Sequence, residues 1–156
     1  MADGNAALTE EFPILIRLAR AAEQRLVQAR WNRRLLRLPT GAPYTDGEGV
    51  HVALGRGVMD MRMDRGVLAA MHRRYIDDLL AHPDTGVLIA VLPDLDEPLG
   101  WLCWTGARCH YVDVLAAARR NGVARRLVQH VRAAVGRPMT ATFVTRDGAP
   151  LLEYLR

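Results

Sequence analysis

The sequence predicts a single domain with a mixed α/β fold, and three features of its pattern support this. Three apolar segments of strand length follow one another between residues 87 and 115, separated only by short turns. Segments with apolar residues at helical spacing lie before and after them. A glycine, Gly122, stands where the last of these strands gives way to a helix. The 156 residues, half of them hydrophobic, are enough for one domain spanning residues 1–156.

The first half of the chain is predicted to contain one strand and two helices. Residues 12–18 (FPILIRL) are rich in isoleucine and leucine, which is typical of a strand. Residues 21–38 carry apolar side chains at helical spacing, and Pro39 ends that helix. Asp64 is the expected N-cap of a second helix that runs to Ala81. The segments between them are expected to be a polar tail at residues 1–11, a glycine-rich loop at 40–57 and a short extended segment at Met59, Met61 and Met63.

The second half is predicted to form an antiparallel meander followed by a helix, a strand and a helix. The expected meander strands are Val87–Leu92, Leu99–Trp104 and Cys109–Leu115. Because the turns between them are short, consecutive strands must run in opposite directions. The later elements are a helix from Gly122 to about Val135, a strand at Met139–Thr145 and a helix from about Ala149.

Composition limits the chemistry that the chain can perform. All 21 basic residues are arginine, because the sequence contains no lysine, and it contains no serine either. Serine hydrolases, lysine Schiff-base enzymes and P-loop nucleotide hydrolases are therefore excluded. The net charge of +4 suits an anionic ligand or partner. Six arginines on or beside the predicted helix at 21–38 are expected to be a solvated face, with phosphate or nucleic-acid binding as the alternative: Arg20, Arg25, Arg30, Arg33, Arg34 and Arg37.

Cysteine content and hydropathy predict a cytoplasmic protein that does not enter a membrane. Two cysteines are too few for a disulfide framework, and the N-terminus does not resemble a signal peptide. The longest apolar runs have the length of a strand and are far shorter than a membrane span. Cys103, Cys109 and His110 could meet across a hairpin, but their spacing matches no zinc pattern, so no metal site is expected.

The junction between residues 112 and 127 is predicted to bind phosphate. A short apolar strand ends at Val114, and an amphipathic helix begins at Gly122. The start of a helix exposes unpaired backbone N–H groups, and the helix dipole favours negative charge there. Gly122 lets a ligand approach the main chain, while Arg119 and Arg120 add positive charge. Close packing of the helix against a sheet is the alternative reason for the glycine.

The spacing Arg-x-x-Gly-x-Ala, from Arg119 to Ala124, resembles the acetyl-CoA-binding motif of the GNAT acetyltransferases. The order of the predicted elements is similar to the GNAT order. More narrowly, residues 110–125 resemble the small GNAT-like proteins of tailed bacteriophages, and the resemblance extends over residues 64–145. It implies a mostly antiparallel central sheet flanked by helices. Because the sequence stops at Arg156, the last two strands of the usual GNAT sheet are expected to be lacking.

The same resemblance implies a binding site for acetyl-CoA as co-substrate. In GNAT proteins the pantetheine arm pairs with a strand edge like an additional strand. Main-chain groups of Val112, Asp113 and Val114 would therefore bind the arm. The residues expected at the pyrophosphate are Arg119, Arg120, Gly122, Val123 and Ala124.

Three residues are candidates for proton transfer. Asp113 lies among valines, and it shares one strand face with Tyr111, whereas His110, Val112 and Val114 share the other face. His110 has a suitable intrinsic pKa for a base, with a structural role as the alternative. Many GNAT members protonate the departing thiolate with a tyrosine, expected four residues after Ala149. Glu153 occupies that position, and Tyr154 follows it.

Two functions follow from these expectations. The first is an acetyl-CoA-dependent N-acyltransferase acting on a small-molecule or protein amine. The second is a GNAT-fold structural or adaptor protein of a bacteriophage particle that has lost catalysis, with a homo-oligomer or virion proteins as partners. Membrane partners are not expected, and the arginine-rich helix is the one feature that points to nucleic acid.

Overall fold

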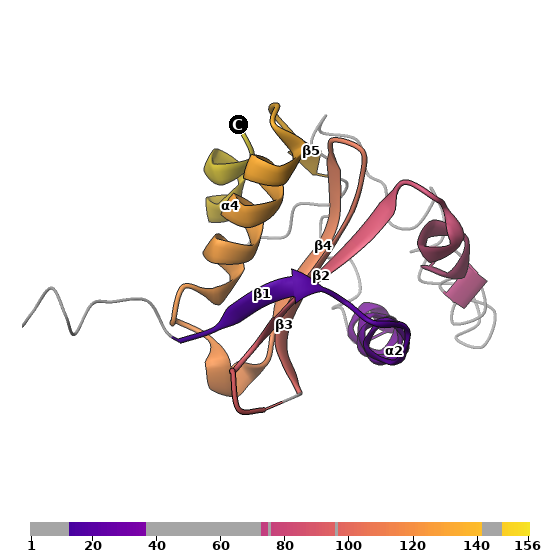
Figure 1. Cartoon of the computed structure of the whole chain (residues 1–156). Coiled ribbons are helices and arrows are strands. Elements are labelled where there is room, and N and C mark those ends of the chain that lie inside the picture. Colours follow the sequence, from indigo (N-terminus) through magenta and orange to yellow (C-terminus); the bar gives the residue numbers. More distant parts are fainter. Residues whose placement is uncertain (1–12, 37–72, 75, 96, 142–147) are drawn as a thin grey trace, which may run out of the picture.

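The part of the chain that the structure describes forms a five-stranded sheet with helices on both faces. The computed structural model describes residues 13–36, 73–74, 76–95, 97–141 and 148–156, with only the main chain of residues 32–36. In these residues the strand order is β1-β2-β3-β4-β5. Helix α4 covers one face of the sheet, and helix α2 lies on the other (Figure 1). The predicted α/β fold, with a mostly antiparallel sheet flanked by helices, is confirmed.

Antiparallel pairing joins the first four strands. They are β1 (Leu15–Leu18), β2 (Thr85–Val91), β3 (Pro98–Thr105) and β4 (Arg108–Val114). The predicted meander is therefore confirmed as β2, β3 and β4, with small differences at the strand ends. The last strand, β5 (Thr140–Ala141), runs parallel to β4 and pairs with Arg108 and Cys109.

The helices also follow the prediction, with one change of type. Helix α2 spans Ala21–Leu36, and helix α4 spans Val123–Val135. Residues 73–74 and 76–81 are helical and belong to the second predicted helix. The last predicted helix is a 3₁₀ helix, η2 (Ala149–Leu155), and a shorter one, η1 (Ala116–Ala118), follows β4. In the described part of the chain, no helix combines the length and apolar character needed to cross a bilayer.

Several predicted segments lie outside the described residues. They are the tail at 1–11, the beginning of the first predicted strand at Phe12, the glycine-rich loop at 40–57, the methionine segment at 59–63, the Asp64 N-cap and residues 142–145 of the last predicted strand.

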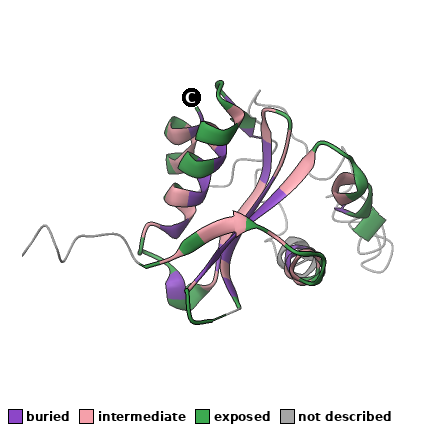
Figure 2. Cartoon of the chain, in the orientation of Figure 1, coloured by how far each residue is buried: buried purple, intermediate pink, exposed green. Residues whose placement is uncertain are grey.

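The sheet separates two hydrophobic clusters. Strand β2 serves both, because Leu88 and Ala90 belong to the cluster beneath α4, while Val87, Ile89 and Val91 belong to the cluster beneath α2. We call these the α4-side and α2-side clusters. The central strands accordingly contain many of the buried residues (Figure 2).

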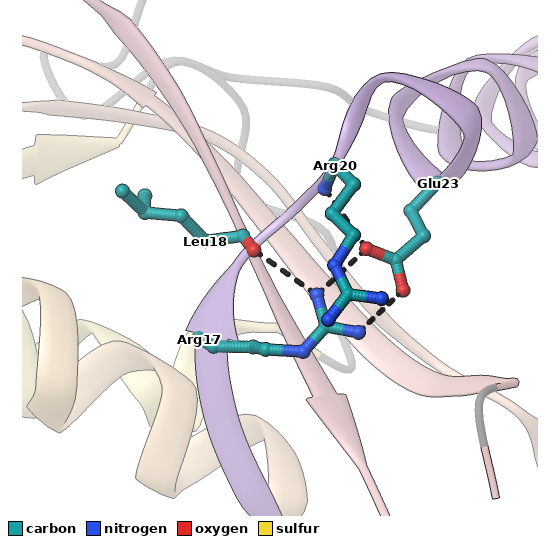
Figure 3. Close-up of polar contacts among 4 residues, drawn as sticks. All are labelled: Arg17, Leu18, Arg20 and Glu23. Atoms are coloured by element: carbon teal, nitrogen blue, oxygen red, sulfur yellow. Dashed lines mark hydrogen bonds and ion pairs between the residues drawn. The ribbon is translucent and has the colours of Figure 1, made fainter.

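An ion pair fixes the connection between β1 and α2 (Figure 3). Both terminal nitrogens of Arg17 donate to the Glu23 carboxylate, each at 2.7 Å. The Arg20 backbone N–H also donates to Glu23 Oε1 at 2.8 Å, as in one half of a capping box. The hydrogen bonds from Arg17 lower the pKa of Glu23. The first turn of α2 is therefore held to the strand that precedes it.

Arg30 departs from the solvated face that was expected for the arginines of α2. Its guanidinium lies over the Trp101 ring, 4.9 Å from the ring centroid. It also donates to the Pro98 carbonyl at 3.1 Å and to Glu97 at 3.0 Å. Arg30 thus anchors α2 to the beginning of β3.

Candidate functional site

The connection between β4 and α4 contains two residues with left-handed backbone. The predicted helix is confirmed as α4, with Gly122 at its N-cap and a φ of 74°. Arg120 has a φ of 66°, and among the described residues it is the only non-glycine residue with a positive φ. For a residue with a side chain, this conformation costs about 1–2 kcal/mol. Such strained positions concentrate at ligand sites, so Arg120 marks the junction as a candidate site.

The N-terminus of α4 offers free backbone donors. The first intrahelical bond runs from the Arg126 N–H to the Gly122 carbonyl at 3.0 Å. The N–H groups of Val123, Ala124 and Arg125 therefore have no carbonyl one turn earlier in the helix. Gly122 has no side chain with which to cap them, and the first turn of α4 contains no acidic residue. These properties suit an anion such as a phosphate group.

Arg125 adds positive charge at this N-terminus. A Cβ atom built on Gly122 would lie 3.1 Å from Arg125 Nη2, so the guanidinium lies over the glycine. Arg125 was not among the site residues predicted from the sequence. The signal for it is its position three residues after Gly122, because residues at that spacing are neighbours on a helix surface.

Gly100 sets how closely α4 approaches the sheet. A Cβ at this position in β3 would lie 3.0 Å from Val123 Cγ1, 3.2 Å from the Asp113 carbonyl oxygen and 3.3 Å from Leu127 Cδ1. The beginning of α4 therefore packs directly over the β3 main chain. Because Val123 and Leu127 are buried, this end of the helix is held rigidly against the sheet.

The side chain of Arg119 turns back toward β4. Its Nε donates to the Val114 carbonyl at 3.0 Å, and its Nη2 lies 3.7 Å from Asp113 Oδ1. Asn121 closes the same turn by donating to the carbonyls of Ala118 and Arg119, both at 3.1 Å. Arg119 was predicted to lend its charge to a pyrophosphate, whereas here its guanidinium braces the end of β4.

Asp113 lies at the centre of a small polar network. Its Oδ1 accepts the Val114 backbone N–H at 2.9 Å, and its Oδ2 accepts the Tyr111 hydroxyl at 2.9 Å. The Tyr111 ring stacks on Trp31 of α2, with centroids 4.8 Å apart and planes 4° from parallel. Asp113 and Tyr111 thus share a strand face, as predicted. The link to Trp31 had no signal in the sequence, because α2 and β4 are far apart in the chain.

A bulge at His110 breaks the alternation of β4. Cys103 pairs with Tyr111 and Trp104 pairs with Cys109, so His110 is the additional residue. Cys109 therefore belongs to the α4-side cluster, although Tyr111, two residues later, packs on the α2 side. Beyond the bulge, Val112 and Val114 both face the α4-side cluster. The predicted face shared by His110, Val112 and Val114 is thus correct for the two valines, while the bulge removes His110 from their alternation.

His110 lies in a polar cluster at the β3–β4 hairpin. One ring nitrogen is 2.9 Å from Thr105 Oγ1, which is itself 2.6 Å from Thr85 Oγ1. Burial and the nearby charge of Arg108 lower the pKa of His110 to about 4. The imidazole is therefore neutral at physiological pH and hydrogen-bonded within the hairpin.

The two cysteines lie on opposite faces of the sheet. Cys103 belongs to the α2-side cluster and Cys109 to the α4-side cluster. Burial raises the pKa of both thiols, that of Cys109 to about 12. They are therefore protonated packing residues, and the fold does not gather them around an ion.

Tyr154 lies on η2, away from the polar network of β4. It is half-buried against the α4-side cluster. Its helix runs beside the C-terminal part of α4, where Arg132 Nε donates to the Arg156 carbonyl at 3.2 Å (Figure 1). The structure thus brings Asp113, Val114 and Arg119 together. His110 lies on the same strand but bonds to Thr105 at the β3–β4 hairpin, and Tyr154 lies on η2.

Comparison with known proteins identifies the fold. The sequence matches no family model and no curated protein. Solved structures do match, among them the GCN5-related N-acetyltransferase from Rhodopseudomonas palustris. That alignment covers 81% of this chain and 68% of the other, with 13% identity and a TM-score of 0.50. The chain has the GNAT fold.

Two further solved structures are similar to this chain. The apo form of YjaB from Escherichia coli has 19% identity and a TM-score of 0.51, with 92% of this chain and 79% of the other covered. The aminoglycoside acetyltransferase meta-AAC0020, from an uncultured soil metagenomic sample, has 11% identity and a TM-score of 0.51, with 91% and 84% covered. At such identities the likeness concerns the fold alone.

Proposed function

We propose that this protein is an acetyl-CoA-dependent N-acyltransferase. The observation that carries the proposal is the N-terminus of α4, where free backbone donors, a glycine N-cap and the Arg125 guanidinium converge beside a strained Arg120. This arrangement fits the pyrophosphate of coenzyme A in both charge and backbone access. In the chain this helix N-terminus follows β4, the fourth strand of the sheet.

Each part of the junction has a role in this proposal. The N–H groups of Val123 and Ala124 bind the pyrophosphate, with Arg120 and Gly122 shaping the turn and Arg119 contributing its main chain. Val112 and Val114 offer main-chain groups to the pantetheine arm. Bound acetyl-CoA supplies the activated acyl group as a thioester. Asp113 is the carboxylate at this site that can accept a proton from an amine.

The other two candidates for proton transfer, His110 and Tyr154, have different roles. His110 is a weak base because its pKa is about 4, so we assign it to the stability of the β3–β4 hairpin. Tyr154 is retained as the candidate acid for the departing thiolate. The acceptor is a small-molecule or protein amine.

Calorimetric titration with acetyl-CoA tests the proposal. The wild-type protein is expected to bind, and Gly122→Glu is expected to weaken binding by at least about 100-fold, because like charges about 4 Å apart repel by several kcal/mol near a protein surface. Gly136→Glu is the matched control: Gly136 has a φ of 75° and caps the other end of α4 with open space around it. It introduces the same strain and charge away from the site.

Two results would overturn the proposal. If the wild-type protein does not bind acetyl-CoA at millimolar concentration, the enzyme is excluded and a GNAT-fold structural protein, such as one from a phage particle, becomes the better reading. If Gly122→Glu binds as well as Gly136→Glu, the pyrophosphate does not lie at the N-terminus of α4.

A further inference from the structure

The edge of β4 that faces β5 is occupied at Val114 by side chains of this chain. The Leu115 N–H donates to the Leu99 carbonyl of the preceding strand at 2.8 Å. Because successive residues of a strand direct their backbone groups to opposite edges, Val114 directs its own toward the β5 side. There the Val114 N–H donates to Asp113 Oδ1 and the Val114 carbonyl accepts from Arg119 Nε. Both groups that an added strand would pair with are already engaged.

The Asp113 carboxylate is held in this position from two other directions. Tyr111 donates its hydroxyl to Oδ2 at 2.9 Å, and the Tyr111 ring is fixed by its stacking on Trp31. Arg119 Nη2 lies 3.7 Å from Oδ1. A hydrogen bond from a backbone N–H to a charged carboxylate is also stronger than one to a neutral carbonyl. The carboxylate is therefore an effective competitor for the Val114 N–H.

We propose that in the free protein the Asp113 carboxylate blocks the Val114 N–H, at the β4 edge where the pantetheine arm would pair. Tyr111 is the residue that positions the carboxylate there. This inference rests on the proposed function. When an amide carbonyl of the pantetheine arm takes the Val114 N–H, it displaces Oδ1 of Asp113. The displaced carboxylate remains beside the Tyr111 hydroxyl and becomes free to accept a proton from the amine. Binding of the donor and release of the base are thereby coupled, so the acceptor reacts only when the donor is in place.

The first test is calorimetric titration with free coenzyme A. Asp113→Ala removes the carboxylate that competes for the Val114 N–H, and it is expected to tighten binding about tenfold. The free energy of a tenfold change in affinity is no larger than the contribution of one hydrogen bond to a charged group. Asp113→Asn keeps the shape but not the charge, and it is expected to bind with intermediate affinity. Tyr111→Phe retains the stacking and removes only the hydroxyl, so it is expected to tighten binding by about threefold.

The second test is hydrogen exchange of the Val114 amide in the free protein, measured by NMR. Exchange is expected to be about tenfold faster in Asp113→Ala than in the wild type. The Leu115 amide, which bonds to β3, serves as the internal control and should not change. A merely structural role for Asp113 would accelerate both amides and weaken coenzyme A binding.

The two tests distinguish failure of this inference from failure of the proposed function. If the wild type binds coenzyme A, and Asp113→Ala and Tyr111→Phe bind it equally or more weakly, the closing role of Asp113 is refuted while the proposed function stands. If Val114 exchange is unchanged in Asp113→Ala, the contact itself is refuted. If every variant and the wild type fail to bind, the proposed function is refuted and this inference with it, whatever the Val114 amide shows.

Discussion

Replacement of Gly100 by alanine is expected to disturb the packing of α4 against the sheet. The new methyl group would lie 3.0 Å from Val123 Cγ1, 3.2 Å from the Asp113 carbonyl oxygen and 3.3 Å from Leu127 Cδ1. All three distances are shorter than ordinary van der Waals contact, and one neighbour is backbone that cannot rotate away. Overpacking of this kind costs about 1–3 kcal/mol.

A smaller effect acts in the opposite direction. Alanine restricts the unfolded chain more than glycine does, which stabilises the folded state by about 0.4–1 kcal/mol. We therefore expect a net loss of about 1–2 kcal/mol in the free energy of unfolding, measured by urea denaturation. Because the contact bears on the first turn of α4, affinity for acetyl-CoA should fall as well.

The double variant Gly100→Ala/Val123→Ala is the control for this reasoning. Val123→Ala removes the atom nearest to the new methyl group, so the two substitutions together should cost less than the sum of their separate effects. Unchanged or increased stability in Gly100→Ala would show that α4 can shift without cost. Strict additivity in the double variant would show that Val123 is not the source of the clash.

Two further predictions concern the pKa of His110 and the hydrogen bonds of Glu23. The pKa of His110 falls from 6.5 to about 4 in the folded protein, so the unfolded state takes up the proton first as pH decreases. Between about pH 6.5 and pH 4 the free energy of unfolding of the wild type should therefore fall by up to about 3 kcal/mol relative to that of His110→Gln, measured by urea denaturation. If the free energies of unfolding of the two proteins depend on pH in the same way, His110 is not buried as a neutral imidazole. Glu23→Gln should lower the free energy of unfolding by about 1–2 kcal/mol, because the carboxylate accepts three hydrogen bonds that fix the start of α2. Glu97→Gln alters an exposed ion pair and should cost less than about 0.5 kcal/mol, and equal losses in the two variants would refute the importance of the Glu23 contacts.

The elements that the sequence predicts well are those with a regular apolar period. Strands β2 to β4 are short apolar runs separated by short turns, and helix α4 combines apolar residues at helical spacing with Gly122 at its beginning, so their positions follow from the local sequence. The type of the last helix does not follow from the local sequence. Residues 149–155 form a 3₁₀ helix, which places Tyr154 about 120° from Glu153 rather than the 100° of an α-helix.

The details of the candidate site depend on contacts between distant segments. The bulge at His110 is set by the pairing of β4 with β3, and nothing in the local sequence marks the additional residue. Arg119 is predicted as a phosphate ligand by its position in the motif, but its rotamer is determined by the Val114 carbonyl. In the same way, the stacking of Trp31 on Tyr111 exists only when α2 has docked against the sheet.

The two clusters on either side of the sheet differ in how far apart their members are along the chain. Among the described residues, every buried member of the α4-side cluster lies between Leu88 and Leu155, so this cluster can form from contacts among neighbouring elements. The α2-side cluster joins Trp31 to Ile76 and to the meander, which closes a loop of about 45 residues. Because loop closure costs entropy before the distant contacts can compensate, we expect the meander and α4 to assemble early in folding. Helix α2 then docks last, and with it Trp31 reaches the ring that holds Asp113 in place.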